Sequence, residues 1–499
     1  MKINKISRIF LIGALGFFVQ ACTDLEVTET DSVLSPDAGG FVTVDPAATL
    51  ASAYVDLGAF TDQANIYALY AHTTDEMIPP TRGVDWGDNG VWRTLHQHTW
   101  DATHAFVRDA WNQLNQRAFK TNTILASNPT PAIEAEAKFL RAFYMFHVMD
   151  LYGQVPFREV DEGPKVNPRV LTRSEAFDFI VKDLEEALPN LPNTGPAATN
   201  PKATQAAANA MLARLYLNKA VYTAARPEGP YQHDVADMNK VIQYCDAVTA
   251  AGYGLESEYF KAFSNAAASE VVFTSAEGTP QNRWFMTLHY DQNPSGWNGF
   301  ATLADFYAKF EDGDQRKGNY PTPDGSQFSG IGRGFLVGQQ YKDDGSPITN
   351  TRNQQPLAFT SDVPLSGAAT DKGIRVIKYH PSNAGQYILL RYSDVYLMKA
   401  EAIHRGGTDP GGQTALQMVN ALRQARGASQ LGSLSDADIL DERGRELYWE
   451  GVRRIDQIRF GTWANTWSDK TVTDATKVLF PIPQQALDSN PNLQQNAGY

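Results

Sequence analysis

The sequence predicts an all-α protein, a stack of paired helices with one long loop-rich part. Apolar residues recur at helical spacing over most of the 499 residues, and short turns rich in Gly and Pro separate these stretches. Helical spacing is lost over 271–387, where Gly, Pro, Asn, Asp and Ser are dense. With 42% hydrophobic and 20% charged residues, the chain is typical of a globular protein with a large core. A formal net charge of −13 would repel a phosphate backbone, which disfavours nucleic-acid binding.

The first residues have the pattern of an export signal. A basic start precedes an apolar run over 9–19, which is shorter than the roughly 20 residues that a spanning helix needs. This predicts a secretory signal peptide over 1–21. Cys22 follows the small residue Ala21, as at a bacterial lipoprotein cleavage site, so we expect Cys22 to be lipidated and to anchor the chain. An ordinary signal peptide with an unrelated cysteine is the alternative.

A flexible tether and then a first helical part are expected to follow. Residues 22–44 are rich in Thr, Ser, Asp and Gly, which predicts the tether. Over 45–270, Asp45-Pro46 and Thr130-Pro131 each combine an N-cap with Pro at the first helical position, and Thr172 and Glu175 form a capping box. Helices are expected over 46–72, 103–125, 131–149, 173–188, 204–222 and 235–250.

Two further parts complete the predicted organisation. The loop-rich part, 271–387, should carry strands at 271–273 and 375–379 and a helix at 303–310; such a region inside a helical body is uncommon unless it binds something. The C-terminal part, 388–499, should carry helices over 388–405, 414–425 and 435–450, and then an extended Pro-rich strap. Helices of this length joined by short turns resemble tetratricopeptide-type (TPR-like) stacking.

Four sequence blocks, taken together with the N-terminal pattern, resemble one known family. They lie at 136–144 with 152–156, at 391–402, at 442–447 with 450–454, and at 479–483 with 490–499. In this order they are similar to the SusD/RagB family of outer-membrane nutrient-binding lipoproteins. Within the blocks we expect four charged residues to form buried ion pairs between helices, not to act as catalytic groups. These residues are Arg391, Asp394, Glu446 and Arg454.

The resemblance implies a fold, a place and a partner. The fold would be a TPR-like body of about four helix pairs with a variable loop-rich part. The chain would be lipid-anchored in the outer membrane and face the cell exterior. It would dock onto a SusC-like TonB-dependent transporter as an extracellular lid, and it would capture oligosaccharides or other nutrients without converting them. No catalytic residue, cofactor or metal ion is implied.

Exposed aromatic rings indicate where a saccharide would bind. Sugar rings present flat C–H faces edged by hydroxyls, so a site needs aromatic surfaces together with planar polar groups. Two segments supply both, and they match the family's ligand-binding positions by location only. The candidate ligand-binding residues are Arg82, Asp85, Trp86, Asp88 and Trp92 in the first segment, and Trp284, Tyr290 and Trp297 in the second. The alternative is that these rings pack the loops onto the body, as we expect for Trp100, Trp111 and Trp449.

Other chemistry has weaker support. His96 and His98 would lie on one face of a strand, where they could bind a metal ion, but no third ligand has a recognisable spacing. No nucleophile motif stands out. Two alternatives to non-catalytic glycan binding stay open. One is a peptide-capturing lipoprotein of the same architecture; the other is a surface glycoside hydrolase, which would need two facing carboxylates about 5–10 Å apart.

Overall fold

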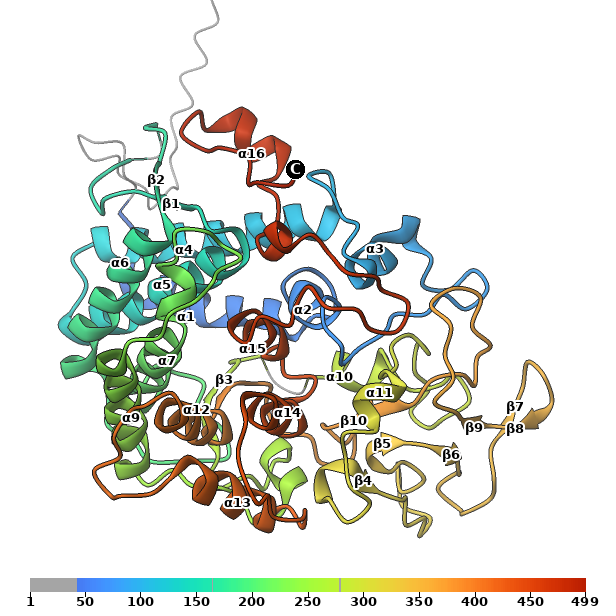
Figure 1. The fold of residues 1–499 in the computed structure, drawn as a ribbon. Helices are drawn as coiled ribbons and strands as arrows, with labels where there is room; N and C mark the ends of the chain where they lie inside the picture. The colour runs from blue at the N-terminus through green and yellow to red at the C-terminus, as the bar shows by residue number, and fades with distance from the viewer. Residues whose placement is uncertain (1–42, 164, 278–279) are drawn as a thin grey trace, which may run out of the picture.

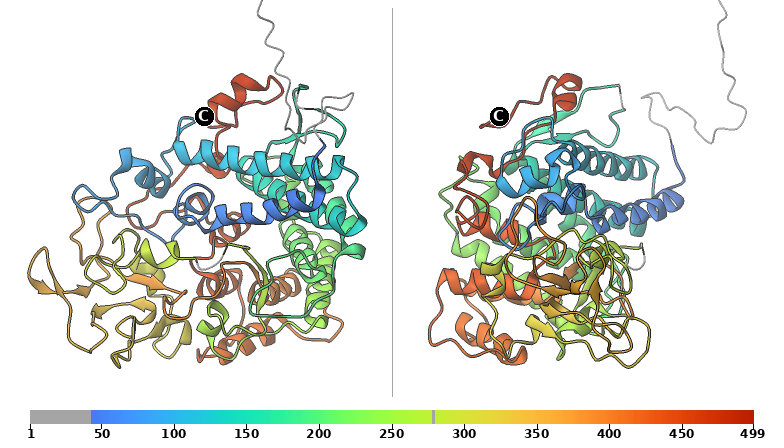
Figure 2. Two further views of the ribbon diagram at one scale, coloured as in Figure 1. Left: turned by 180° about the vertical axis from the view of Figure 1, so that it is seen from behind. Right: turned by 90° about the vertical axis from the view of Figure 1, so that its right-hand side faces the viewer.

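The computed structural model describes residues 43–163, 165–277 and 280–499 (Figure 1). The predicted signal peptide, Cys22 and all but the last two residues of the predicted tether lie outside this range. Helices dominate, and the strands are only two to four residues long. The longer helices gather in one body, and the short strands between residues 318 and 377 gather at the opposite end of the molecule (Figures 1 and 2).

The N-terminal part is helical, as the sequence predicts. Asp45 and Thr130 cap their helices, and the capping box of Thr172 and Glu175 is present. The expected helix over 46–72 is instead interrupted by a 3-10 turn at Asp56–Thr61. The helices are α1 (Pro46–Val55), α2 (Asn65–Ala71), α3 (Val91–Gln97), α4 (Ala105–Ala126), α5 (Pro131–Tyr152), α6 (Arg173–Ala187), α7 (Gln205–Leu217), α8 (Lys219–Tyr222) and α9 (Val235–Ala250).

The C-terminal part returns to the same body. Its helices are α12 (Tyr392–His404), α13 (Ala415–Ala425), α14 (Asp436–Leu447), α15 (Arg453–Arg459) and α16 (Gln484–Ser489). The expected helix over 388–405 begins later, because β11 (Ile388–Arg391) pairs with β3 (Val271–Thr274). The terminal strap is also partly helical, since it contains α16; its Phe480 N–H donates to the Leu151 carbonyl at 2.8 Å.

Packing runs continuously from one helix to the next. Helix α5 packs against both α4 and α6, α7 packs against α9, and α12 packs against α9 and α13. Helix α5 is buried along most of its length, as expected for a helix that is apolar on most sides. Because the same helix contacts two neighbours, the division into about four pairs stays a prediction. No helix in the described ranges is long and apolar enough to cross a membrane.

Buried ion pairs hold the C-terminal helices together, and most of the partners lie outside the four residues predicted to form them. Arg391 pairs with Glu270 at 2.6 Å and with Glu446 at 3.0 Å. Asp394 pairs with arginines of other helices, Arg214 at 2.8 Å and Arg443 at 2.6 Å. Arg454 faces Asp150 at 3.5 Å. The predicted role is confirmed, and the partners come from distant segments that sequence spacing does not reveal.

The loop-rich part is organised around an antiparallel sheet of β4 (Gly318–Asn319), β5 (Arg333–Leu336) and β10 (Arg375–Ile377), in the order β10-β5-β4. Within it, Val376 lies opposite Phe335. The short helices α10 (Asn282–Phe285) and α11 (Ala304–Tyr307) accompany the sheet. Two further strand pairs of this part are β6 (Gly338–Gln339) with β9 (Ala358–Phe359) and β7 (Thr349–Asn350) with β8 (Gln355–Pro356). The pair β1 (Val155–Phe157) with β2 (Arg169–Leu171) belongs to the N-terminal part.

Candidate functional site

Three loops of the loop-rich end meet and bring the two predicted segments together. The Trp86 Nε1–H donates to the Trp297 carbonyl at 2.9 Å, and the Tyr290 hydroxyl donates to the Asp85 carboxylate. Arg352, from a third loop, lies 4.3 Å from the Tyr290 ring centroid and 3.4 Å from the Asp85 carboxylate. We call Asp85, Trp86, Tyr290, Trp297 and Arg352 the Trp86–Trp297 face.

The loop that carries Trp86 has an unusual backbone. Arg82 and Asp85 exchange backbone hydrogen bonds of 3.0 and 3.2 Å, which closes a tight turn. Trp86, Asp88 and Asn89 then have φ angles of 61°, 34° and 53°, in the left-handed region that aromatic residues rarely adopt. Such conformations persist only where surrounding contacts impose them, and they concentrate at functional sites.

A glycine in the second segment makes the contact between the segments possible. A Cβ at Gly299 would lie 2.4 Å from the Trp86 ring and 2.8 Å from the Met286 carbonyl oxygen. No side chain other than hydrogen can therefore occupy this position without moving the indole. Beneath Trp86 lie the rings of Phe300, at 4.8 Å, and Trp92, at 5.4 Å between centroids.

The outer rings of the face are presented to solvent. The Trp297 side chain is 40% exposed and stacks on Phe285 with centroids 5.7 Å apart and an interplanar angle of 28°. Trp86 and Tyr290 are half-buried. The Arg352 side chain is 52% exposed, so a guanidinium and a carboxylate stand at the edge of the rings. Stacking surfaces and bidentate polar groups thus lie side by side.

Two of the four loop tryptophans are not available to a ligand, which corrects the sequence prediction. Trp92 and Trp284 are each only 4% exposed and belong to the hydrophobic core. The Trp92 Nε1–H donates to the Asp88 carboxylate at 2.6 Å, so Asp88 holds a core ring in place. Trp100, Trp111 and Trp449 are core residues, as expected. Large rings are usually buried, and the sequence pattern did not separate the exposed ones from the others.

Arg82 is also buried, at 1% exposure, and acts as a clamp. Its guanidinium donates to the carbonyls of Ala369 and Lys372, which ties the Trp86 loop to the segment that precedes β10. Burial lowers the pKa of Arg82 to about 10, and nearby Tyr290 opposes that shift. The predicted role of Arg82 as a direct ligand contact is therefore corrected to a positioning role.

Tyr290 is held as a hydrogen-bond donor. Partial burial raises its pKa to about 12, and the hydrogen bond that its hydroxyl donates to the Asp85 carboxylate adds to the shift. The loop with Tyr290 is fixed further by the Asp291 carboxylate, which accepts hydrogen bonds from the Thr351 N–H at 3.0 Å and hydroxyl at 2.8 Å. This contact also places the neighbouring Arg352.

Two contributing residues were missed in the sequence, Arg352 of the face and Phe285, on which Trp297 stacks. Arg352 lies in the turn between β7 and β8, more than fifty positions beyond Trp297, and no motif marks it. Phe285 precedes Trp297 within the same segment, and its aromatic character was the one available signal.

The histidine pair does not form a metal site on a strand. His96 lies in α3 and His98 follows it, and both rings are buried. The two His96 nitrogens contact the carbonyls of Met77 at 3.2 Å and Ser468 at 2.9 Å. Among the described residues no group of three His, Cys, Asp or Glu side chains could hold a metal ion.

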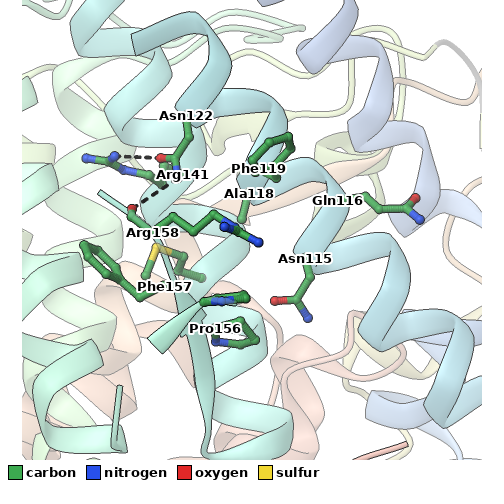
Figure 3. Close-up of a pocket in the computed structure, with 11 residues that line it drawn as sticks. Asn115, Gln116, Ala118, Phe119, Asn122, Arg141, Pro156, Phe157 and Arg158 are labelled. Atoms are coloured by element: carbon green, nitrogen blue, oxygen red, sulfur yellow. Dashed lines mark hydrogen bonds between the residues drawn. The ribbon is translucent and has the colours of Figure 1, made fainter. Parts of the chain in front are cut away.

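A separate hollow of about 350 Å³ lies on the helical body, between α4, α5 and β1 (Figure 3). Its walls include Ala118, Phe119, Met145, Pro156 and Phe157 and are mostly apolar. At one edge Arg141 donates to the Asn122 side chain at 2.8 Å. The hollow has no indole, although amide and guanidinium groups also line it, from Asn115, Gln116, Asn122, Arg141 and Arg158.

Comparisons with known proteins agree with the fold and with the family expected from the sequence. A model described as "SusD family" matches residues 236–470, and one described as "Starch-binding associating with outer membrane" matches residues 32–217. The starch-binding protein SusD of Bacteroides thetaiotaomicron is 23% identical over the full length of both chains.

Solved structures show the same fold. A SusD superfamily protein from Parabacteroides distasonis has a TM-score of 0.69 at 18% identity, over 91% of this chain and 98% of its own. Surface glycan-binding protein A from Bacteroides thetaiotaomicron, in complex with laminarihexaose, has a TM-score of 0.65 at 18% identity, over 90% and 98%. Two family models, which match residues 32–217 and 236–470, and a full-length relative lead to one conclusion: the chain belongs to the SusD family.

Proposed function

We propose that this protein binds oligosaccharides or polysaccharides at the cell surface, through the Trp86–Trp297 face, and passes them unaltered to a SusC-like TonB-dependent transporter of the outer membrane. The observation that carries the proposal is the partly exposed Trp297 ring beside Trp86, edged by a carboxylate and a guanidinium. Relatives of the same fold are named as starch-binding or are solved with laminarihexaose, which supports a saccharide as the ligand class.

The two carboxylates predicted for the site, Asp85 of the face and Asp88 of the same loop, support binding and not hydrolysis. Asp85 accepts a hydrogen bond from Tyr290 and faces Arg352, and Asp88 is engaged with the Trp92 indole. A glycoside hydrolase needs one carboxyl group that protonates the leaving oxygen and a second that faces it across the sugar. These two carboxylates each hold a neighbouring side chain instead.

The proposed setting follows from the sequence. Lipidation of Cys22 would anchor the protein in the outer membrane, and residues 22–44 would act as the tether between anchor and body. No cofactor or metal ion is needed for binding. The transporter partnership and the outward orientation rest on the family membership.

A glycan array and two variants test the proposal. The array is probed with the intact chain and then with Trp297→Ala, which we expect to lose at least about tenfold in affinity because a stacking ring is removed. Trp297→Phe keeps an aromatic ring and should retain most of the binding. Phe119→Ala, which removes a partly exposed ring on the helical body, is the matched control.

Four results would overturn the proposal or a part of it. If Trp297→Ala and the parent bind glycan equally, the Trp86–Trp297 face is not the binding site. Reducing ends released from the bound glycan would establish a hydrolase instead. Binding to peptides, with no glycan bound on the array, would favour the peptide-capturing alternative. Purification of the native complex without a TonB-dependent transporter would remove the delivery step.

A further inference from the structure

A second aromatic pocket lies in the loop-rich part, outside the Trp86–Trp297 face. It has a volume of about 380 Å³, within the roughly 300–1,000 Å³ range of ligand pockets. We call it the Tyr320 pocket, after its most exposed ring. The residues that give it its chemistry are Tyr307, Lys317, Asn319, Tyr320, Phe335 and Gln339.

The aromatic surface of this pocket is positioned by regular structure. Tyr320 directly follows β4, whose Asn319 lies opposite Arg333 of β5, and it is followed by Pro321. The Tyr320 ring is nevertheless 83% exposed, which makes it one of the most exposed large side chains in the described ranges. Tyr307 and Phe335 form an adjacent wall, edge to face with centroids 5.2 Å apart.

The polar groups of the pocket suit an uncharged ligand with many hydroxyls. The Lys317 ammonium is neutralised by Asp312 at 2.6 Å. The Gln339 amide nitrogen donates to the carbonyls of Gln340 at 2.6 Å and Ile348 at 3.1 Å. Within the described part of the chain, no hydrogen bond engages the Gln339 amide oxygen or the Asn319 side-chain amide. These groups can therefore form hydrogen bonds with the hydroxyls of a ligand. Aromatic walls with free amides and no net charge match a neutral saccharide.

A peptide strand is a poorer match for the same place. A peptide that extends a sheet needs an open edge, and β4 is the edge strand of β10-β5-β4. That edge is only two residues long and is soon followed by Pro321, which has no N–H to donate.

We propose that the Tyr320 pocket is a second saccharide-binding site, which acts together with the Trp86–Trp297 face to retain a neutral polysaccharide. This inference rests on the proposed function. The two sites share no residue, yet they are linked: Gln340 lines the pocket and accepts a hydrogen bond at 3.3 Å from Gln292, which lies between Tyr290 and Trp297. Two sites in one part of the fold favour a polymer that reaches both, since binding at the second becomes intramolecular.

The experiment compares short and long glycans. The intact chain, Tyr320→Ala, Trp297→Ala and the double variant are titrated with laminarihexaose, maltohexaose, laminarin and soluble starch. For whichever glucan series binds, Tyr320→Ala should weaken polymer binding by about tenfold or more, because the contribution of the second site is lost. Hexasaccharide binding that survives in Trp297→Ala should disappear in the double variant.

Matched variants keep the result specific. Tyr320→Phe retains the ring and should bind polymer like the parent, and Val472→Ala removes an exposed apolar side chain elsewhere. Because Tyr320 is mostly exposed, its replacement should leave the unfolding midpoint unchanged. The unfolding midpoint is measured on the same samples as the titrations.

The possible failures are distinguishable. If Tyr320→Ala binds all four glycans like the parent, the second site is overturned, while the loss caused by Trp297→Ala would still support the proposed function. If Trp297→Ala has no effect and Tyr320→Ala abolishes binding, the Trp86–Trp297 assignment fails and the Tyr320 pocket stands as the binding site. If crystals soaked in hexasaccharide show sugar at the Trp86–Trp297 face alone, the second site is also overturned.

Discussion

The helical body and the loop-rich end use different side chains at their centres. In the body, Glu446 pairs with Arg391 and Arg426 at 3.0 and 2.9 Å, and all three side chains are almost fully buried. At the loop-rich end, the Trp86–Trp297 face leaves rings partly in water. The blocks that carry the family resemblance contain Glu446 and Arg391, while every residue of the face lies outside them. These blocks therefore report architecture, and none of the proposed ligand contacts lies within them.

The largest expected effect is in the helical body. Glu446→Ala would leave Arg391, Arg426 and Arg316 without a shared carboxylate in the interior. Removing one partner from a buried ion pair typically costs about 3–5 kcal/mol, and here three cations are affected. We expect at least that loss in the free energy of unfolding, measured by urea denaturation.

An exposed ion pair provides the control for this prediction. Glu134 and Lys138 pair at 2.7 Å, but the Glu134 side chain is 44% exposed. Glu134→Ala should therefore change the free energy of unfolding by no more than about 0.5 kcal/mol. Equal effects of the two variants would contradict the contrast between buried and exposed charge.

Acid should weaken the same body through its carboxylates. Burial on its own would raise the pKa of Glu442, but Arg316 and Arg445 outweigh it and lower the pKa to about 2. Burial likewise opposes the shift at Glu401, whose pKa is about 2 because of Arg459 and Arg405. A carboxyl with a depressed folded-state pKa contributes stability that is complete above its unfolded value, near 4.3, and is lost as the pH falls through the folded value.

We therefore expect stability to fall by a few kcal/mol between about pH 4.3 and pH 2. Urea titrations at a series of pH values, followed by far-ultraviolet circular dichroism, measure the loss. Glu442→Gln, although less stable at pH 7, should show a shallower decline over this window. A stability that does not change across it would show that these carboxylates are not held ionised by their arginines.

The face itself is tested by a single methyl group. Gly299→Ala places a Cβ against the Trp86 ring and the Met286 carbonyl, so the indole or the chain must shift. Overpacking of this kind costs about 1–3 kcal/mol, and glycan binding should fall along with it. Gly254→Ala, where nothing lies within 4 Å of the added Cβ, is the matched control for both measurements. If Gly299→Ala binds glycan like the parent, the position of the Trp86 ring does not matter for binding.

Sequence reasoning gave most of the helical architecture, because capping and spacing are local signals. The caps at Asp45, Thr130 and Thr172 are present, and α5 is buried as its composition predicts. The errors arose where a tertiary contact overrode local pattern. Residues 388–391 have helical spacing but pair with β3 as a strand, and the segment with His96 is helical where a strand was expected.

The site was less accessible to sequence reasoning, because exposure depends on what packs over a ring. Trp86 and Trp92 lie six positions apart with similar polar neighbours, yet one is half-buried at the surface and the other is in the core. Arg82 was expected to meet a ligand and instead holds a loop, while Asp88 is exposed, holds the Trp92 ring through one carboxylate oxygen, and stays a predicted contact. Arg352 reaches the face through the Asp291–Thr351 contacts, which no sequence spacing encodes.

The smallest expected effect is at the rim of the face. Arg352 stacks on Tyr290 and faces Asp85 at 3.4 Å, but its side chain is about half exposed, so solvent screens the pair. Arg352→Ala should change the free energy of unfolding by less than about 1 kcal/mol. Glycan affinity should fall by roughly three- to tenfold, because a planar donor group is removed. Arg352→Lys, which keeps the charge but lacks the planar fork, should recover little of that affinity. Full recovery of glycan affinity by Arg352→Lys would mean that only the positive charge matters at this edge. The contrast drawn here, between charges that act in the helical body and planar groups that act at the face, would then fail for Arg352.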